Sequence, residues 1–394
     1  MKKVNIIICH SDPLSNIGGT EKYINSKIKY YKNLSTDSLV VYIQKIKRKD
    51  RSFLGKKYNY GININHQKFV EKVDIKTLVK KLQDLTINKE IKLFLVESIV
   101  SWLNDKRSLK YIFNYIKKLP GQKYISFHDT LFMCSDIVVY PRKNNNYTKN
   151  YSLKNSAKCY FCKSSWIVNF YNKIFFLKFL NLVDKINIPS DFIRDLFIEK
   201  YGKKFNDKLI VKEHVKKTKT NLRSNSKIKN KNAKIKIAYL GNISDIKGMN
   251  EFIKLANDNN LSKNYEFYSI GRDFKDKNIA SIVVDYNSQQ QEMITGSIVS
   301  DLLYKKSINI VFLFSKVAES YSYTMHEADC SAIPIISSNF SGNISYQIKS
   351  GNVYGICFEN YDEIYNFLIG KDKVINFINN NNKVLIDFMK DNNE

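Results

Sequence analysis

Strand-length hydrophobic runs alternate with helix-length segments along most of the chain. The first run, Val4 to Cys9, is followed by a glycine-containing loop and a helix that we expect to begin near Thr20, with Thr20 capping its first turn. Further strand-length runs are 38–43, 92–96, 124–127 and 185–188, and the helix-length segments are 75–85, 108–118 and 191–201. Regular alternation of this kind favours a parallel sheet covered by helices.

The same alternation starts again after a polar stretch. Residues 218–233 are rich in Lys, Asn and Ser, which is typical of a solvated basic linker. We therefore predict an N-terminal domain over 1–217, a C-terminal domain over 234–370 and a last helical segment, 371–394, that crosses back to the first domain. In the second domain we expect strands at 235–240, 265–270, 281–284, 308–314, 333–337 and 354–358, and helices at 248–256, 296–304, 323–330 and 342–349. Two Rossmann-like α/β domains facing a cleft would suit an elongated ligand.

Composition and charge narrow the class of protein. At 394 residues, with 43% hydrophobic and 13% aromatic residues, the chain has enough apolar surface for two globular cores and is unlike a disordered protein. The formal net charge of +27 favours contact with phosphates, acidic sugars or an anionic membrane. A basic nucleic-acid-binding protein is an alternative, although the Lys residues are scattered and lie on no recognisable reading helix.

The chain shows no sign of export or of membrane insertion. Met1 to His10 has only a strand-length apolar run and lacks the cleavage site of a signal peptide. No stretch reaches the roughly 18 uninterrupted apolar residues of a spanning helix. We therefore expect a cytoplasmic protein whose membrane contact, if any, is peripheral and at the inner face of the cell membrane.

Three of the six cysteines, Cys134, Cys159 and Cys162, form an irregular cluster. The last two have a C-x-x-C spacing that could hold zinc if a fourth ligand joined them. With three cysteines and a long gap the pattern is weak, and we otherwise expect free thiols in a reducing compartment.

Two glutamates stand out near the mouth of the second sheet. Glu319 follows the predicted strand 308–314, and Glu327 lies on the next helix. The residues that open this helix are Ser322, Tyr323 and Thr324, and a helix N-terminus binds anions such as a diphosphate. Two carboxylates so placed could hold both ends of a nucleotide sugar; the alternative is a helix with ordinary surface glutamates.

The segment 314–343, FSKVAESYSYTMHEADCSAIPIISSNFSGN, resembles the donor-binding core of the retaining family-four glycosyltransferases. In that family a glutamate, seven residues and a second glutamate precede a proline-containing strand and a glycine loop. Further matching pieces are Gly18 and Gly19, 187–190 and 240–248. The resemblance covers most of the chain in the correct order and implies the two-domain GT-B fold.

The resemblance also implies roles for the donor-side residues. Glu319 would bind hydroxyls of the transferred sugar, Glu327 the ribose, and Lys247 the diphosphate leaving group. The chain departs from many relatives after Gly241, where Asn242 stands in place of an arginine. Either the diphosphate is stabilised less strongly, or another cation, such as Arg272 after Gly271, stabilises it instead.

On the acceptor side, Gly18 and Gly19 would let the backbone approach the donor phosphate or the acceptor, although a Gly-Gly pair is often just a turn. The family often carries a His-Asp pair where this chain has His128 and Asp129, directly after the strand 124–127. We expect His128 to contact the donor sugar or the acceptor, with a core or capping role as the alternative, and Asp129 to be a candidate base.

These features predict a retaining, metal-independent glycosyltransferase of the hexosyltransferase type. Its catalytic residues would be Lys247, Glu319, His128 and Asp129, and it would need no cofactor. It would transfer a sugar from a nucleoside diphosphate to a glycan or a lipid-linked glycan, in bacterial surface polysaccharide synthesis. The alternatives are a non-catalytic nucleotide-sugar or glycan-binding protein of the same fold and, further off, a nucleic-acid-binding protein.

Overall fold

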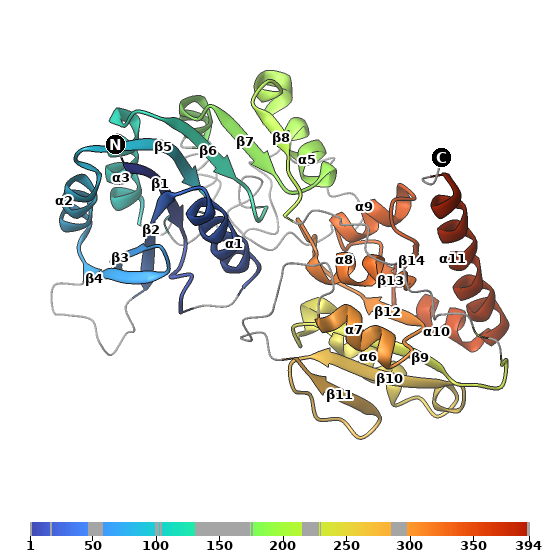
Figure 1. The fold of residues 1–394 in the computed structure, drawn as a ribbon. Helices are drawn as coiled ribbons and strands as arrows, with labels where there is room; N and C mark the ends of the chain where they lie inside the picture. The colour runs from blue at the N-terminus through green and yellow to red at the C-terminus, as the bar shows by residue number, and fades with distance from the viewer. Residues whose placement is uncertain are drawn as a thin grey trace. The chain divides into compact units, whose positions relative to one another are not determined.

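The structure is a computed structural model that describes residues 2–15, 18–45, 58–98, 102, 105–130, 174, 176–214, 228, 230–284 and 298–391. The chain divides into two compact α/β units and passes from the first to the second after His214 (Figure 1). Residues 218–227 and 229 of the predicted linker lie outside the described residues, so the domain boundaries at 217 and 234 stay predictions.

The first unit contains an eight-stranded sheet in the order β4-β3-β2-β1-β5-β6-β7-β8. Its strands are β1 (Lys2–Cys9), β2 (Thr36–Lys45), β3 (Tyr58–Ile64), β4 (Gln67–Val73), β5 (Lys89–Val96), β6 (Gln122–Ser126), β7 (Lys185–Ile188) and β8 (Leu209–Val211). The central strand β1 pairs in parallel with both β2 and β5. The sheet is nevertheless mixed, because β2 with β3 and β3 with β4 pair antiparallel, which corrects the expectation of a parallel sheet.

The β3–β4 hairpin was not predicted, and its turn explains why. Asn65 and His66 both adopt positive φ, at 45° and 68°, as a tight two-residue hairpin turn requires. Asn-Gly is the usual sequence signal for such a turn, and a histidine at the second position does not announce it. The short edge strand β8 was missed as well, since three residues carry little pattern.

The helices of the first unit are α1 (Gly19–Asn33), α2 (Ile75–Thr86), α3 (Lys106–Lys118) and α5 (Asp191–Tyr201), with a 3₁₀ turn η4 (Gly202–Phe205) after α5. Helix α1 begins one residue earlier than expected and has Gly18 rather than Thr20 at its N-cap position. Ile24 and Ile28 of α1 pack on Ile7 of β1 and Val40 of β2. The helix therefore covers one face of the sheet beside its central strand.

The second unit contains a six-stranded sheet in the order β11-β10-β9-β12-β13-β14, in which every neighbouring pair is parallel. Its strands are β9 (Ile235–Gly241), β10 (Tyr265–Gly271), β11 (Ile279–Val283), β12 (Ile310–Leu313), β13 (Ile335–Ser338) and β14 (Gly355–Phe358). Its helical elements are η5 (Asp245–Lys247), α6 (Met249–Ala256), η6 (Leu261–Lys263), α7 (Ile298–Lys305), α8 (Tyr323–Cys330), α9 (Asn343–Lys349), α10 (Tyr361–Ile369) and α11 (Lys371–Asp391).

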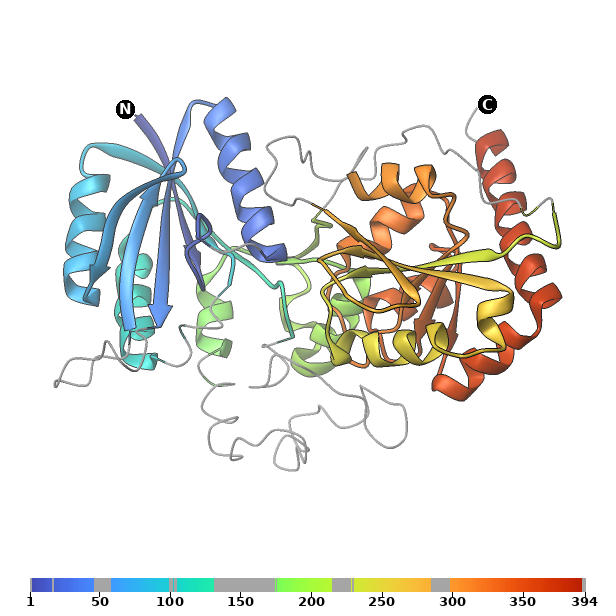
Figure 2. The ribbon, with the colours of Figure 1, turned by 90° about the horizontal axis from the view of Figure 1, so that it is seen from below.

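Both faces of this second sheet are buried, and Figure 2 shows helices on either side of it. Along β9, Ile237 and Tyr239 join a core with α6, α10 and α11, while Ala238 and Leu240 join the opposite core with α7, α8 and α9. Successive side chains of a strand point to opposite faces, so a continuous apolar run is what a sheet covered on both sides needs.

Of the predicted C-terminal segment, the described residues Lys371–Asp391 form α11. Val374, Ile375 and Ile378 of α11 belong to the core of the second unit, and Asn381 Nδ2 donates a hydrogen bond to Ala332 O at 2.8 Å. The first half of α11 therefore packs on the second unit, and its crossing to the first stays a prediction. None of the helices in the described ranges is long and apolar enough to cross a membrane.

Candidate functional site

The order in which successive strands are added to the second sheet reverses between β9 and β12. The strands that follow β9 in sequence, β10 and β11, lie on one side of it, whereas β12, β13 and β14 lie on the other. In open α/β sheets, ligands bind outside the carboxyl ends of the strands at such a switch point. A ligand site is therefore expected at the loops that follow β9 and β12.

Lys247 and Glu319 meet there. Lys247 is the last residue of η5, after β9, and Glu319 lies in the loop after β12. The Lys247 Nζ atom lies 2.9 Å from Glu319 Oε1, with the lysine side chain 35% exposed and the glutamate side chain 15% exposed. A partly exposed ammonium and a largely covered carboxylate thus lie together at the switch point.

The main chain holds Glu319 on both sides. Its N–H donates to Ser341 O at 3.2 Å, and its carbonyl accepts from Asn343 N at 2.8 Å, which gives a parallel bridge between Glu319 and Gly342. Gly342 has a φ of 65°, and a Cβ there would lie 2.6 Å from the Glu319 nitrogen. Only glycine fits this contact, so the glycine loop sets the position of Glu319.

The N-terminus of α8 lies beside the end of β9. Ser322 caps the helix by accepting a hydrogen bond from Met325 N, and its hydroxyl is 3.1 Å from that of Thr324. A Cβ built on Gly241, the last residue of β9, would lie 3.6 Å from Thr324 Cγ2. The first turn of α8, where helix amides and dipole favour an anion, therefore adjoins the loop that carries Lys247.

Glu327 lies on α8 three residues after Thr324, so the two share one side of the helix. Its side chain is half-buried, and its carbonyl accepts a hydrogen bond from Ser331 Oγ at 2.7 Å. The predicted arrangement of one glutamate in a loop and one on a helix is confirmed. The ribose contact predicted for Glu327 stays a prediction.

Gly241 and Gly271 lie opposite each other in the register of β9 and β10. The residues that follow them, Asn242 and Arg272, are both exposed and begin neighbouring loops at the same sheet edge. The carbonyl of Asn242 accepts a hydrogen bond from Tyr239 Oη at 2.6 Å. Arg272 thus begins the loop one strand away from Asn242, at the same edge of the sheet.

The switch point of the first sheet, between β1 and β5, holds a buried charged cluster. Glu97, directly after β5, has a fully buried side chain, with Lys27 Nζ at 2.5 Å and His128 Nε2 at 2.9 Å. The His128 side chain is only 3% exposed and packs against the rings of Tyr23 and His214, at centroid distances of 5.0 and 4.7 Å. This geometry favours the core role considered for His128, while the sugar or acceptor contact stays a prediction.

Burial would raise the pKa of Glu97, but the Lys27 ammonium and the hydrogen bond from His128 hold it well below its usual range. Glu97 therefore remains ionised at neutral pH. Sequence reasoning missed it, although it follows a buried strand at the carboxyl edge just as His128 does. Its partner Lys27 lies 70 residues away in the chain, so no local pattern joins the two.

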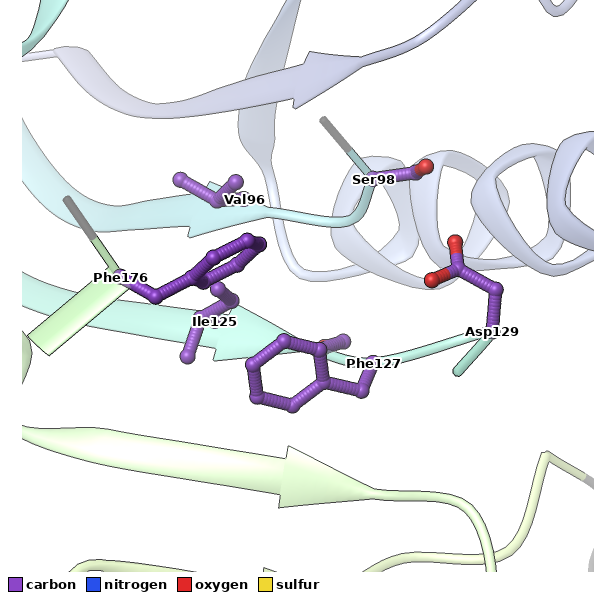
Figure 3. Close-up of a pocket in the computed structure, with 7 residues that line it drawn as sticks. Val96, Ser98, Ile125, Phe127, Asp129 and Phe176 are labelled. Atoms are coloured by element: carbon purple, nitrogen blue, oxygen red, sulfur yellow. The ribbon is translucent and has the colours of Figure 1, made fainter. Parts of the chain in front are cut away.

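Asp129 lines a small pocket at the carboxyl ends of β5 and β6 (Figure 3). Phe127 and Phe176 form apolar walls, and Ser98 and Asp129 point their oxygens toward the same side of the pocket. The Ser98 hydroxyl is buried and has no hydrogen-bond partner among the described residues. The pocket thus combines an apolar wall with a carboxylate and an unsatisfied hydroxyl.

Gly18 and Gly19 begin α1, where a carboxylate already lies. Glu21 in the first turn accepts a hydrogen bond from Ser11 Oγ and has His10 Nε2 at 3.2 Å. A Cβ on Gly18 would lie 2.4 Å from Glu21 Oε2, so Gly18 makes room for this side chain. A phosphate at Gly18 and Gly19 would meet that negative charge, and the predicted contact stays a prediction.

Metal ligation was considered for the cysteine cluster, but Cys134, Cys159 and Cys162 all lie outside the described residues. In the part of the chain that the structure describes, no group of three or more His, Cys, Asp or Glu side chains could hold a metal ion. The cysteines that it does describe, Cys9, Cys330 and Cys357, form no disulfide with one another.

Sequence comparison finds no matching family model and no curated relative. Solved structures do match. HepE of Anabaena in complex with UDP-glucose shares 12% identity at a TM-score of 0.52, over 97% of this chain and 94% of that one. Sucrose-phosphate synthase of Thermosynechococcus elongatus shares 10% identity at a TM-score of 0.56, over 97% and 94%. At this identity the likeness concerns the fold, and it confirms that the chain has the GT-B fold of the nucleotide-sugar glycosyltransferases.

Proposed function

We propose that this protein is a retaining glycosyltransferase that moves a sugar from a nucleoside diphosphate to a hydroxyl of a glycan or lipid-linked glycan. The observation that carries the proposal is the Lys247–Glu319 pair at the switch point of the second sheet. A cation for the diphosphate, a carboxylate for sugar hydroxyls and a helix N-terminus adjoin one another there. The complex of HepE with UDP-glucose, a protein of similar fold, supports a nucleotide sugar as the ligand.

The reaction breaks the bond between the anomeric carbon and the diphosphate oxygen and forms a bond from that carbon to the acceptor oxygen. Negative charge grows on the leaving diphosphate, so Lys247 and the amides at the start of α8 would stabilise the transition state. Glu319 would fix the sugar through its hydroxyls, and Glu327 the ribose. Attack from the face that the diphosphate leaves would retain the anomeric configuration.

The acceptor hydroxyl must lose a proton in this step. A leaving phosphate oxygen can take it, and Asp129 is the candidate protein base. Asp129 lies just after β6 at the carboxyl edge of the first sheet, where ligands bind in open α/β folds, which supports an acceptor role for this part of the first unit. The enzyme would act in bacterial surface polysaccharide synthesis in the cytoplasm, at the inner face of the cell membrane, without a cofactor or metal ion.

The proposal is tested by screening UDP, GDP and dTDP sugars for thermal stabilisation, and then measuring release of the nucleoside diphosphate from the best donor. We expect one base to stabilise the protein and its sugar conjugate to be hydrolysed slowly without an acceptor. Activity should survive a chelator such as EDTA. Loss of activity that manganese or magnesium restores would contradict the metal-independent mechanism.

The second candidate is a protein of the same fold that binds nucleotide sugars without turning them over. The exposed Asn242, where many family-four relatives have an arginine, is the observation that favours it. Donor binding without any release of nucleoside diphosphate, with or without glycan acceptors, would decide for this candidate and against the enzyme.

A further inference from the structure

Lys316 lies in the loop after β12, three residues before Glu319, at the centre of a charged cluster. Its Nζ atom lies 2.6 Å from Asp245 Oδ1 and 2.9 Å from Glu251 Oε1. Asp245 is the first residue of η5, and Glu251 lies in the first turn of α6. The two carboxylates therefore flank, in sequence, the short segment that carries Lys247.

Main-chain contacts join the same two loops. The Lys316 N–H donates to Ile246 O at 2.9 Å. Gly248 has a φ of 83°, and a Cβ there would lie 2.3 Å from Phe314 O, so the segment after η5 runs directly against the end of β12. The 3₁₀ turn η5 is only three residues long and has no side-chain cap of its own. Its position depends on contacts from outside it.

The ion pair between Lys316 and Asp245 favours the charged form of both groups. Partial burial lowers the pKa of Lys316, but hydrogen bonds to Asp245 and Glu251 outweigh it, so the pKa lies above its ordinary value. The hydrogen bond from Lys316 in turn lowers the pKa of Asp245. The Asp245 side chain is 57% exposed, so solvent screens its ion pair with Lys316 and the pair adds little to stability. The significance of the cluster therefore lies in geometry rather than in global stability.

We infer that Lys316 is a positioning residue of the donor site: it ties η5 to the loop after β12 and so directs Lys247 across the switch point toward Glu319. This inference rests on the proposed function. Lys247 must be ordered when the donor binds, and ordering its side chain and the short segment that carries it costs conformational entropy. If the segment that carries Lys247 is held before the donor arrives, less of that cost falls on binding and on the transition state.

The experiment measures the affinity for UDP, GDP and dTDP by calorimetry, and turnover of the corresponding donor, in three variants. Lys316→Met removes the ammonium but keeps the aliphatic chain, and we expect on the order of tenfold weaker binding, since hydrogen bonds to charged groups have about that weight. Lys316→Arg, which can still reach both carboxylates, should keep most of the affinity.

The third variant separates positioning from simple charge attraction. Glu251→Leu breaks the cluster while it removes a negative charge, which by long-range electrostatics alone would strengthen the binding of an anion. Positioning predicts weaker binding instead, with kcat lowered along with it. Urea unfolding of the ligand-free variants shows that each is folded, and Asp245→Asn replaces any variant that is not.

The measurements distinguish failure of the proposed function from failure of the positioning role alone. If the wild-type protein binds none of the three diphosphates, the proposed function fails, and the role of Lys316 fails with it. If it binds one of them and Glu251→Leu binds it equally or more tightly, only the positioning role is overturned.

Discussion

Lys247 and Glu319 form a 2.9 Å ion pair although 72 positions of sequence separate them, because each follows one of the two neighbouring strands at which the second sheet reverses its order. In the proposed function the donor enters beside or between them. The proposed roles of the two residues, one on the diphosphate and one on the sugar, mean that donor binding exchanges this internal pair for contacts with the ligand.

Replacing Lys247 with Met should lower turnover more than donor affinity. The charge on the leaving diphosphate is larger in the transition state than in the bound donor, so the lost interaction counts mainly there. We expect kcat to fall roughly 100-fold, the size reported by removal of one charge-stabilising group. Steady-state kinetics measure the split, and a change confined to KM would make Lys247 a ground-state contact only.

Replacing Glu327 with Ala should weaken nucleotide binding by about 10- to 100-fold, because a hydrogen bond to a charged group contributes roughly 1.5–3 kcal/mol. The comparison between the nucleoside diphosphate and its 2′,3′-dideoxy analogue is the check. In the wild-type protein the analogue should bind more weakly. In the variant that difference should vanish, and its persistence would contradict a ribose contact.

Gly342→Ala should abolish most of the transfer activity by pushing Glu319 from its place, since the new Cβ would lie 2.6 Å from the Glu319 nitrogen. Gly351 provides a matched control: its φ of 74° is similarly positive, but nothing lies within 4 Å of a Cβ there. Gly351→Ala should cost on the order of 1 kcal/mol in the free energy of unfolding because of its positive φ. Gly342→Ala should cost more, since its Cβ also meets the backbone of Glu319. Only Gly342→Ala should lose activity. Equal activity in the two variants would contradict the role of the glycine loop in positioning Glu319.

Glu21 should stabilise the first unit in a pH-dependent way. Burial raises its pKa, but hydrogen bonds from His10 and Ser11 outweigh this and lower the pKa from its ordinary value near 4.5 to about 2. A depressed carboxyl pKa stabilises the fold above the unfolded value and loses that effect as the pH falls through the folded value. The difference in unfolding free energy between wild type and Glu21→Gln should therefore be on the order of 3 kcal/mol at pH 6.

That difference should shrink between pH 4.5 and pH 2, which urea unfolding at a series of pH values can follow. Glu90→Gln is a suitable control, because Lys92 also lowers the pKa of Glu90, but both side chains are exposed and solvent screens their ion pair. A difference for Glu21→Gln that stays constant across this range would show that the carboxylate is not held in its charged form by its neighbours.

Much of the fold could be predicted because its signals are local. Ser190 and Ser322 lie at the N-caps of α5 and α8, and both helices begin and end where the sequence indicated. Glu319 could be found because it follows a buried strand within a few positions, whereas Lys247 was identified through the family resemblance. The family resemblance added roles that the strands alone do not give.

The features that were missed depend on contacts between distant segments. The ion pairs of Glu97 with Lys27 and of Lys316 with Asp245 join residues 70 and 71 positions apart, and each residue alone looks like an ordinary surface charge. The β3–β4 hairpin has a turn, Asn65-His66, whose backbone geometry follows from the sheet rather than from the usual residue preference. Pairing and register are decided by packing, and a single sequence records them only weakly.

The packing of α11 decides where the second unit can be cut. Val374 and Ile378 are completely buried in the same core as Ile364 and Leu368 of α10, so a fragment that stops at residue 370 would leave an apolar face of its sheet without cover. An independently expressed second unit must therefore extend at least to Asn381. A shorter fragment would expose this apolar core and aggregate, so its loss of activity would say nothing about catalysis.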